Sequence, residues 1–593
     1  MEIVQLEIKN FRCIKYALIK PQKHNVFLAP NNTGKTAVLE ALNLLLNPDL
    51  SSWSRVVDEN DFYNREYFIP SAVSQPTICI EAVLIGLKEE DQDDFRQGLI
   101  AWDSSNAQVI EESEEGIDVF QNNELATRVK FEGFYDSEDD DFKWKTFFRR
   151  KAEETRDDAP LFGRTHKRRI GFLIYRDIRA LSRPTTLEPT TLFARLLQSQ
   201  DVPLKNFDAV LENLNNCMMP MHQEPEFMSV LNSYKAELER FLLLYQSGDS
   251  SFSFELTSRT RDELKSAAQL YTGDVDNVSM PIQKMGAGTR SLALLAILTL
   301  IMRRRQRGIL ALEEPETFLF PHAQRRVLSE ALKLADQTFV TTHSPYVLEQ
   351  LPIEAVGKLE RTANGEANYV QLSKVTAKAL KLYNRRLRQA FSEAMLGRAV
   401  VVVEGDSDKW WIDAVGQLLN GVTDGDFTHE AFDLTGITVV SSETHGDSIK
   451  TAEFFKSLNL PVLIVLDKLN DEQVVANHIQ AGIPTIFLKQ TGLEAAISEY
   501  IPIDLVAEFL SSAPLTSGQN LSSSDLGAKT ADDQRQILMM LLRKNKGSRQ
   551  THEWLIDRLP LSKIPPPLLI TVSLINKHYF GSKKIRGVIS PVK

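Results

Sequence analysis

The chain has 593 residues, of which 43% are hydrophobic and 25% are charged, as in an ordinary globular protein and unlike a disordered or fibrous one. Its 68 basic and 79 acidic residues give a net charge of −11. This charge excludes a protein that coats nucleic acid with positive charge everywhere, but not one with a local basic groove. The cysteines Cys13, Cys79 and Cys217 lie far apart in the sequence. They therefore argue against a disulfide framework and fit a reducing compartment.

The N-terminal residues carry no apolar core of the kind found in a signal peptide. The longest apolar run, 292–302, is closed by arginines on both sides and is too short to span a bilayer. We therefore expect a cytoplasmic protein without a membrane partner.

The first half of the chain mixes strands and helices. Apolar alternation predicts strands within 3–8 and 25–28, followed by a helix over 35–46. Between 50 and 180 we expect short strands and charged loops, with the acidic run 136–141 at a loop tip. The apolar spacing over 188–247 is helical throughout and predicts an inserted group of helices.

Strand character is expected to return from residue 252, and an apolar strand is predicted over 308–312. A second series of buried strands begins near Gly397, with runs at 398–405, 460–467 and 483–489 that alternate with helices. Such alternation predicts a small parallel sheet, and the fold class is therefore α/β. The stretch 511–529, rich in Ser, Gly and Thr, is expected to be a loop.

A motif between the strand at 25–28 and the helix after it is typical of a phosphate-binding loop. Residues 29–36 read Ala-Pro-Asn-Asn-Thr-Gly-Lys-Thr, the P-loop pattern with Ala29 in place of the usual first glycine. We expect Lys35 to neutralise the β- and γ-phosphates of ATP and Thr36 to ligate Mg²⁺, at the start of the helix. The alternative is an Asn-rich turn that only caps this helix. The expected nucleotide-binding residues of the loop are Asn31, Asn32, Gly34, Lys35 and Thr36.

Paired acids follow the strand at 308–312. Glu313 has the position of a metal-water ligand, and Glu314 that of a base that polarises the attacking water. The next strand leads to His343, at the strand end where α/β sheets place ligands. Taken alone, an acidic pair is typical of a surface turn and a single histidine of a satisfied core residue.

The order of these motifs resembles the ABC-type ATPase heads of the SMC and RecF class. The series is Asn10-Phe11-Arg12, the P-loop, GAGTRS at 286–291, LEEPE and TTHSP. By resemblance, Arg12 lies near the nucleotide. Gly286 and Gly288 belong to the signature loop and present backbone N–H groups to the γ-phosphate held by a second protomer, so hydrolysis requires two heads to meet. Gly286 stands where the class usually has serine, which removes one hydroxyl contact.

A second set of acids follows the strands of the C-terminal half. Glu404 and Asp408 lie in the string Val-Val-Val-Glu-Gly-Asp-Ser-Asp, Asp467 ends the strand at 460–467, and Glu494 follows later. Carboxylates that converge at strand ends form a hard-oxygen site for Mg²⁺ or Mn²⁺. Two such ions can stabilise the attacking and the leaving oxygen of a phosphodiester. Each acid alone is otherwise a helix cap or an exposed residue.

This set resembles the Toprim fold. An ABC-type head followed by a Toprim domain is the arrangement of the OLD family, the overcoming-lysogenisation-defect nucleases. The resemblance covers nearly the whole chain. It implies ATPase parts at 1–185 and 251–385, a helical dimerisation element at 186–250, and a Toprim domain with a C-terminal extension at 386–593. Family members are Mg²⁺-dependent DNA nickases or endonucleases, several act in defence against phage, and some have partners such as helicases or retron ribonucleoproteins.

The family motifs carry over with one departure. Glu404, Asp408, Asp467 and Glu494 match acidic positions of the Toprim site, but the second Asp of the family's Asp-x-Asp motif is Leu469, which cannot ligate a metal. This departure leaves one-metal cleavage, altered metal preference and lost cleavage open. The family lysine that stabilises the transition state is best matched within 543–547. We favour Lys546 over Lys544, with an ordinary surface charge as the alternative.

Basic clusters occur at 149–151, 167–169, 385–388 and 583–586 and are candidates for a phosphate-binding groove, although each alone is more typical of a solvated face. No motif for base-specific readout is present, so backbone and shape recognition is expected. We expect a homodimer or larger assembly in which ATP gates access of DNA to the Toprim acids. The alternatives are an ATP-dependent clamp or sensor that does not cut, favoured by Leu469, and an RNA-cutting enzyme. A topoisomerase would need a Tyr nucleophile on an added domain.

Overall fold

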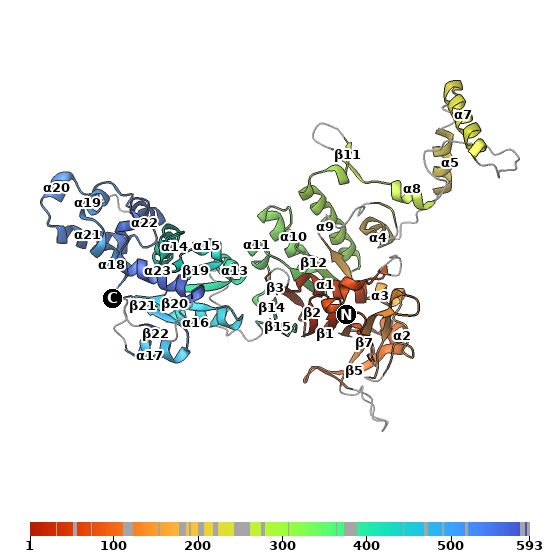
Figure 1. The fold of residues 1–593 in the computed structure, drawn as a ribbon, viewed down its shortest axis with the longest axis horizontal. Helices are drawn as coiled ribbons and strands as arrows, with labels where there is room; N and C mark the ends of the chain where they lie inside the picture. Colours follow the sequence, from red (N-terminus) through yellow and green to blue (C-terminus); the bar gives the residue numbers. More distant parts are fainter. Residues whose placement is uncertain are drawn as a thin grey trace. The chain divides into compact units, whose positions relative to one another are not determined.

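The computed structural model describes the chain outside a set of excluded segments. These are residues 31–32, 51–55, 71, 73, 111–122, 152–153, 177–185, 189–190, 200–206, 218–222, 242–260, 274–278, 306–307, 363, 373–387, 443, 468–471, 489–491, 516–519, 582–587 and 590–593. The chain forms two compact units (Figure 1). The first comprises Met1–Asn25, Gly34–Thr342 and Thr362–Ala367, and the second comprises Val26–Thr33, His343–Arg361 and Asn368–Lys593.

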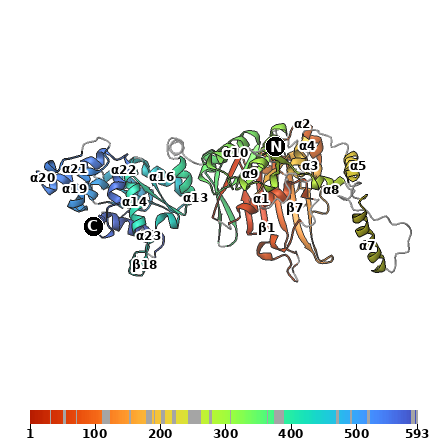
Figure 2. The same ribbon diagram turned by 90° about the horizontal axis from the view of Figure 1, so that it is seen from above.

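An antiparallel sheet carries the N-terminal strands, in the order β2-β1-β4-β7-β5-β6 with β8 paired to β7. Its longest members, β1 and β7, are seen together in Figure 2. The hairpin between β7 and β8 turns at the acidic run 136–141, as predicted. The strands are β1 (Glu2–Phe11), β2 (Ile14–Ile19), β4 (Ile78–Ile85), β5 (Leu99–Asp103), β6 (Gln108–Ile110), β7 (Glu124–Asp136) and β8 (Asp141–Phe148).

A second sheet positions the P-loop and the paired acids, in the order β15-β14-β3-β13-β12-β9. Strand β12 pairs in parallel with both β13 and β9, and Glu313 lies opposite Thr341 at the carboxyl ends of β12 and β13. Strands β12 and β13 are largely buried, as expected for strands that have a neighbour on each side in a parallel sheet. The strands are β3 (His24–Leu28), β9 (Leu173–Tyr175), β12 (Ile309–Glu313), β13 (Gln337–Thr341), β14 (Val356–Arg361) and β15 (Ala367–Gln371).

Helix α1 (Lys35–Leu46) follows β3, with the bounds that the sequence predicted. The expected inserted helices are present as α4 (Leu192–Ser199), α5 (Phe207–Cys217) and α7 (Pro225–Phe241). The expectation that strands resume from 252 is wrong at α8 (Arg261–Ala267). The charged sequence RDELKSA favours a helix there, with Asp262 and Glu263 in the first turn where they complement the helix dipole. Residues 251–260 lie outside the described residues.

The second unit contains a parallel sheet in the order β19-β16-β20-β21-β22, as the sequence predicted. Its valine- and leucine-rich strands are buried on both faces, and helices cover them. The strands are β16 (Ala399–Val403), β19 (Ile437–Ser441), β20 (Val462–Leu466), β21 (Thr485–Phe487) and β22 (Val588–Ile589). Helices α14 (Asp406–Leu418) and α16 (His445–Ser457) connect the strands, and α17 (Glu472–Ala481) follows β20.

A helical extension packs against this sheet and shares its core. Its members are α18 (Leu493–Tyr500), α19 (Ile503–Ser512), α20 (Ser523–Gly527), α21 (Ala531–Lys544), α22 (Arg549–Ile556) and α23 (Pro566–Tyr579). The predicted loop at 511–529 is therefore wrong for 523–527. The hydroxyl of Ser522 accepts from the backbone N–H of Asp525 and so caps a short helix. Among the described residues, no helix is both long and apolar enough to cross a membrane.

Candidate active sites

The P-loop turn rests on the turn between β1 and β2. Gly34 has φ 110°, a conformation that favours glycine, and a Cβ at this position would lie 3.3 Å from Cys13 Sγ and from a side-chain carbon of Ile14. The motif therefore needs glycine for its backbone conformation, with little room for a side chain. Lys35 and Thr36 then open helix α1. The predicted ligands Asn31 and Asn32 lie outside the described residues.

The predicted acids meet the P-loop. Glu313 accepts a hydrogen bond from Thr36, and Glu314 faces Lys35 electrostatically. Burial raises the pKa of Glu313 and lowers that of Lys35. Glu314 has φ 42°, a left-handed conformation unusual for a non-glycine residue and frequent at functional sites. This arrangement brings together the residues that would hold a nucleotide–metal complex and a water-activating base.

Arg12 and His343 are the remaining residues predicted to contact the nucleotide. Arg12 has φ 50° and its Nε binds the Asp61 carboxylate at 2.9 Å, in the turn next to Cys13. This turn is the one on which Gly34 rests, so Arg12 is close to the P-loop in the first unit. His343 is exposed and follows β13 by two residues, at the strand end predicted for it.

The signature glycines have different surroundings. Helix α9 (Ala287–Arg305) begins at this motif, and a Cβ on Gly288 would lie 2.8 Å from the backbone oxygen of Phe318. Gly288 is therefore required for packing inside the protomer. Gly286 is exposed, and a Cβ there would meet nothing within 4 Å. Its predicted contact with a second protomer stays a prediction.

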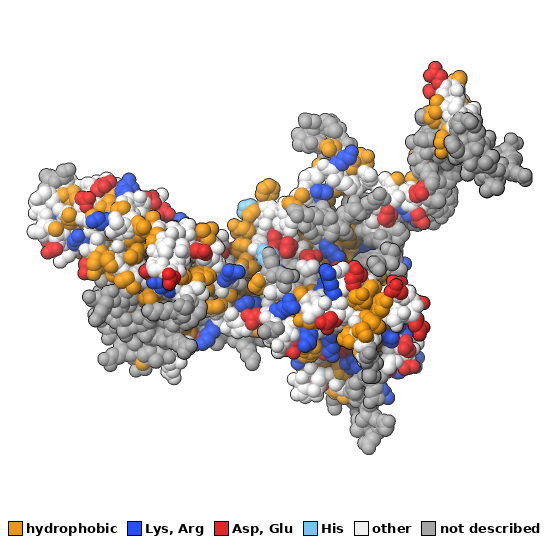
Figure 3. All heavy atoms as spheres, viewed as in Figure 1, with side chains coloured by type: hydrophobic (Ala, Val, Ile, Leu, Met, Phe, Trp, Pro, Cys, Tyr) orange, Lys and Arg blue, Asp and Glu red, His pale blue; other side chains and the backbone are white. Residues whose placement is uncertain are grey.

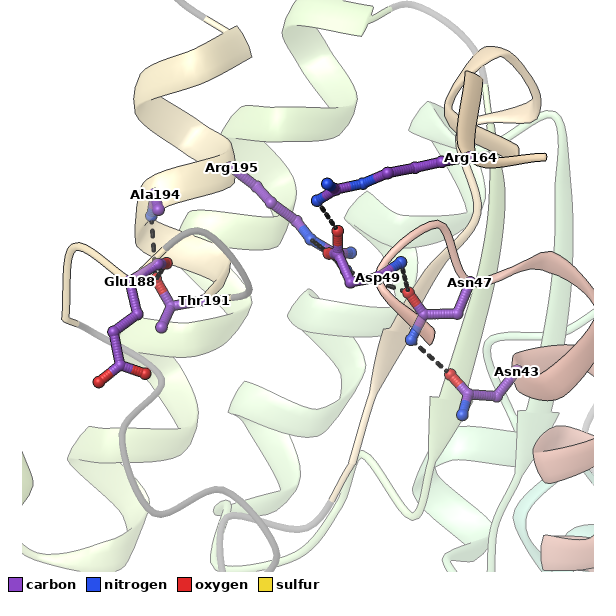
Figure 4. Close-up of polar contacts among 8 residues, drawn as sticks. All are labelled: Asn43, Asn47, Asp49, Arg164, Glu188, Thr191, Ala194 and Arg195. Carbon is purple, nitrogen blue, oxygen red and sulfur yellow. Dashed lines mark hydrogen bonds and ion pairs between the residues drawn. The ribbon is translucent and has the colours of Figure 1, made fainter. Parts of the chain in front are cut away.

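Two ion-pair groups around helix α1 were not found from the sequence. Arg176, which follows β9, donates to Glu40 of α1 at 2.7 Å and also lowers the pKa of Glu313 against the effect of burial. Past the end of α1, the buried carboxylate of Asp49 accepts from Arg164 at 2.7 Å and from Arg195 Nε at 3.0 Å (Figure 4).

Arg195 also donates to Asn47, and Asn47 donates to Asn43 of α1, so one polar chain joins helix α1 to helix α4 (Figure 4). Helix α4 is the first helix of the predicted insertion. These partners come from segments more than a hundred residues apart, which is why local sequence patterns did not reveal them.

The C-terminal acids gather at the carboxyl ends of β16 and β20. Glu404 follows β16 directly and Asp467 follows β20 directly. Asp408 lies in the first turn of α14, where its Oδ2 accepts from Gly405 N at 2.8 Å. Glu494 lies in the first turn of α18 and is 1% exposed. The structure thus brings together all four predicted acids of this set.

The four carboxylates oppose one another. Burial raises the pKa of Asp408, and Glu494 and Glu404 raise it further. Burial likewise raises the pKa of Asp467, and Asp408, Glu404 and Glu494 add to the effect. The negative charges therefore exceed the positive charge that the protein places among them.

Lys546 faces this group, and Lys544 is not in contact with it in any described interaction. The Nζ of Lys546 lies 3.2 Å from Glu494 Oε1. Burial lowers the pKa of Lys546, but Glu494, Asp408 and Asp467 outweigh this and raise it above its ordinary value. Of Lys544 and Lys546, the geometry therefore favours Lys546 as the lysine that acts with the four acids.

A second positive residue at the acids, Arg543, was not predicted from the sequence. Gly492 has φ 117°, and the position of a Cβ on it would lie 3.0 Å from Glu494 Oε2, 3.7 Å from Arg543 Nη2 and 3.8 Å from Asp467 Oδ2. Two acids and one guanidinium thus surround a point that only glycine leaves open.

A buried histidine beside the site was also missed. His552 accepts from Trp411 Nε1 at 3.1 Å through its Nδ1, and its pKa is lowered by burial against the opposing effect of Glu494. Arg543 lies in the stretch 543–547, which was considered only for its lysines, and His552 belongs to no motif. Both lie in the helical extension, and only its packing brings them to the acids.

The chemistry of this donor set fits a divalent cation, because four carboxylates offer hard oxygens and repel one another without one. Within the described residues, however, no three His, Cys, Asp or Glu side chains converge closely enough to hold a metal ion as they stand. Residues 468–471, which include Leu469 and Asp471, are not described.

Three side chains of the described basic clusters make contacts within the first unit. Arg149 donates to buried Glu81 at 2.6 Å, Lys167 is buried, and Arg169 binds buried Asp91 at 3.0 Å. These contacts occupy the three side chains within the first unit, and the phosphate-binding groove stays a prediction. On the face seen in Figure 3, basic and acidic side chains are intermixed over the described residues. The side chains of 385–388 and 583–586 lie outside the described set.

Comparison with known proteins supports both halves of this description. A family model described as "AAA ATPase domain" matches residues 1–160 and 191–348. A model described as "Overcoming lysogenization defect protein-like, TOPRIM domain" matches residues 395–468. A search of curated proteins finds no match.

Several solved structures of SMC heads are similar at low identity. An SMC head bound to the C-winged helix domain of ScpA is 14% identical with a TM-score of 0.33, over 63% of this chain and 100% of that one. The SMC head domain from Thermotoga maritima is 12% identical with a TM-score of 0.26, over 63% of this chain and 99% of that one. A Pyrococcus furiosus SMC head with an extended coiled coil is 13% identical with a TM-score of 0.32, over 62% and 96%.

Proposed function

Since the chain belongs to the AAA ATPase domain family and carries an OLD-like Toprim domain, we propose that it is an ATP-gated, divalent-metal-dependent nuclease that hydrolyses DNA phosphodiesters. The observation that carries the proposal is that Glu404, Asp408, Asp467 and Glu494 lie near enough to interact electrostatically, with Lys546 Nζ 3.2 Å from Glu494. We further propose the predicted division into ATPase parts at 1–185 and 251–385, a dimerisation element at 186–250 and the Toprim part at 386–593.

At the first site, Lys35 binds the phosphates of ATP, and Thr36 with Glu313 would hold Mg²⁺. Glu314 takes a proton from the attacking water, whose oxygen bonds to the γ-phosphorus while the bond to the bridging β–γ oxygen breaks. The products are ADP and phosphate. Because Gly286 lies exposed at the start of α9, it remains available to the nucleotide of a second protomer.

At the second site, the acids would hold Mg²⁺ or Mn²⁺ after moving closer together. When bound, the ion supplies positive charge at the attacked phosphate and lowers the pKa of a bound water. Lys546 stabilises the negative charge that develops on the phosphate oxygens. Water adds to phosphorus, one ester P–O bond breaks, and the leaving oxygen takes a proton. The products are a phosphate end and a hydroxyl end.

Dimerisation through the inserted helices is part of the proposal. On α7, Val230 is 69% exposed and Tyr234 is 58% exposed, and their spacing of four residues places them on one helix face. An exposed apolar face of this kind fits a second copy of the chain. We place the activity in defence against phage, with a possible partner protein or ribonucleoprotein, on the strength of the OLD-like domain.

The test is cleavage of supercoiled plasmid and of total RNA, in Mg²⁺ and in Mn²⁺, with and without ATP. Wild type is expected to cut plasmid and Glu404→Ala is expected to be inactive. The matched control is Glu430→Ala, which removes an exposed carboxylate of the same unit and should cut like wild type. Cleavage by Glu404→Ala at the wild-type rate would refute the assignment of the site, and cleavage of RNA alone would change the substrate.

A second candidate function is an ATP-dependent nucleic-acid clamp or sensor that does not cut. It is favoured by Leu469 in place of an acid and by the lack of a preassembled metal cluster among the described side chains. This candidate predicts that wild type binds DNA with nucleotide-dependent affinity and that no product appears in either metal.

A further inference from the structure

The end of helix α21 places two cations beside the acids of the second unit. Arg543 lies in the last turn of the helix, and Lys546 follows the helix by two residues. Asn545, which is buried, ends the helix through its backbone N–H and donates from its side chain to Leu541 O at 2.8 Å. The helix end is thus fixed, and the two cations extend from one rigid element.

The guanidinium of Arg543 and the two nearest acids face a common point. The Cβ position of Gly492 has Glu494 Oε2, Arg543 Nη2 and Asp467 Oδ2 all within 4 Å. Gly492 also precedes α18 without a side-chain hydrogen bond to cap it. The space next to Gly492 is therefore bordered by a helix N-terminus, a guanidinium and two carboxylates.

Glu494 is more deeply buried than the two cations at this site. Glu494 is 1% exposed, whereas Lys546 is 53% exposed and Arg543 is exposed. An anion that approaches from solvent therefore meets these cations before Glu494. A planar guanidinium offers paired N–H donors that match two oxygens of a phosphate, which an ammonium group does not.

We propose that Arg543 is a substrate-binding residue, which holds a non-bridging oxygen of a nucleic-acid phosphodiester over Glu494 and Asp467. This inference rests on the proposed function and adds to it the residue that positions the phosphate. Lys546 remains paired with Glu494, and Arg543 contributes the second positive charge at the phosphate. The contact is to the backbone and carries no base preference.

The experiment measures binding without turnover. A fluorescein-labelled DNA duplex is titrated with the full chain in Ca²⁺ at several salt concentrations, and a gel confirms that the duplex stays intact. Arg543→Met is expected to raise Kd about 10-fold, because one charge-assisted hydrogen bond to phosphate is lost. The slope of log K against log salt is expected to shrink by about 0.9, the value for one phosphate contact.

Two variants sharpen the test. Arg543→Lys keeps the positive charge and loses the paired N–H donors of the guanidinium. Its Kd should therefore rise about threefold, while the salt slope stays at the wild-type value. Lys544→Met removes the neighbouring exposed cation of the same helix turn and should change Kd less than about twofold. If Arg543→Met unfolds, Arg543→Lys decides, since it preserves charge and length.

The outcomes separate this inference from the proposed function. Equal binding by wild type and Arg543→Met, or equal losses in Arg543→Met and Lys544→Met, would overturn the role of Arg543 even where wild type cuts plasmid. Weakened binding by Arg543→Met with no cleavage by wild type would support the phosphate contact and reject the nuclease. A wild type that binds no duplex would overturn the inference.

Discussion

The two groups of acids lie at equivalent places in their sheets and differ in how the chain balances their charge. Glu313 follows β12, as Glu404 and Asp467 follow β16 and β20. Around the first site, Thr36 donates to Glu313 and Arg176 pairs with Glu40, although burial still raises the pKa of Glu313. In the second site, burial and the neighbouring carboxylates raise the pKa of Asp408 and of Asp467, and Lys546 opposes this effect.

The difference in charge balance indicates which of the two sites folding alone can assemble. At the first site, Thr36 donates to Glu313, and Arg176 joins Glu40 of helix α1 to the end of strand β9. At the second site the protein has gathered like charges that a cation from outside must neutralise. We therefore propose that folding alone assembles the first site and that a divalent ion completes the second.

The largest effect is expected from Glu314→Gln, which keeps the size of the side chain and removes the base. ATP turnover should fall about 10²- to 10⁴-fold, the usual contribution of a positioned general base. Nucleotide binding should persist, because Lys35 and Thr36 are untouched. Steady-state hydrolysis and binding of a fluorescent ATP analogue measure the two properties. Turnover near the wild-type rate would remove Glu314 from the catalytic role.

Asp49→Ala tests the paired charges around helix α1. It leaves Arg195, which is largely buried, without its carboxylate, so the free energy of unfolding should fall by about 3 kcal/mol. Burial raises the pKa of Asp49, but Arg195 and Arg164 outweigh this and lower it. The stabilisation is accordingly present at neutral pH and is lost as the pH falls through the lowered pKa. Urea unfolding at neutral and at acidic pH measures the free energy of unfolding of both proteins. An Asp49→Ala protein as stable as wild type at neutral pH would show that these ion pairs do not stabilise the fold.

Lys167 differs from the paired residues of the first unit, because it is a buried lysine whose described contacts include no carboxylate. It lies 3.3 Å from Thr146 Oγ1, and burial lowers its pKa to about 7. The unfolded chain therefore binds more protons above that pH, and stability rises as the pH increases. Relative to Lys167→Met, wild type should gain about 2 kcal/mol between about pH 7 and about pH 9. A difference between the two proteins that does not change with pH would indicate that Lys167 is charged in the folded state.

The sequence predicts the fold correctly where a motif and a long apolar run coincide. The strand–loop–helix around Lys35 and the valine strand before Glu404 both form as predicted, since apolar pattern and turn residues agree there. Arg543, His552 and Arg176 could not be predicted, because packing between distant segments places them. The helix at 261–267 was missed because its short charged sequence carries no apolar periodicity to identify it.

The most direct test of the contrast between the two sites is thermal unfolding of nucleotide-free protein, with EDTA or with Mg²⁺, for wild type and Asp467→Asn. Asp467 is the suitable position because it directly follows strand β20, whereas Asp408 also caps helix α14. Mg²⁺ should raise the Tm of wild type by relieving the carboxylate repulsion. Asp467→Asn should be more stable than wild type in EDTA and should respond less to Mg²⁺. A wild type that is indifferent to Mg²⁺, together with an Asp467→Asn that is less stable in EDTA, would contradict the account.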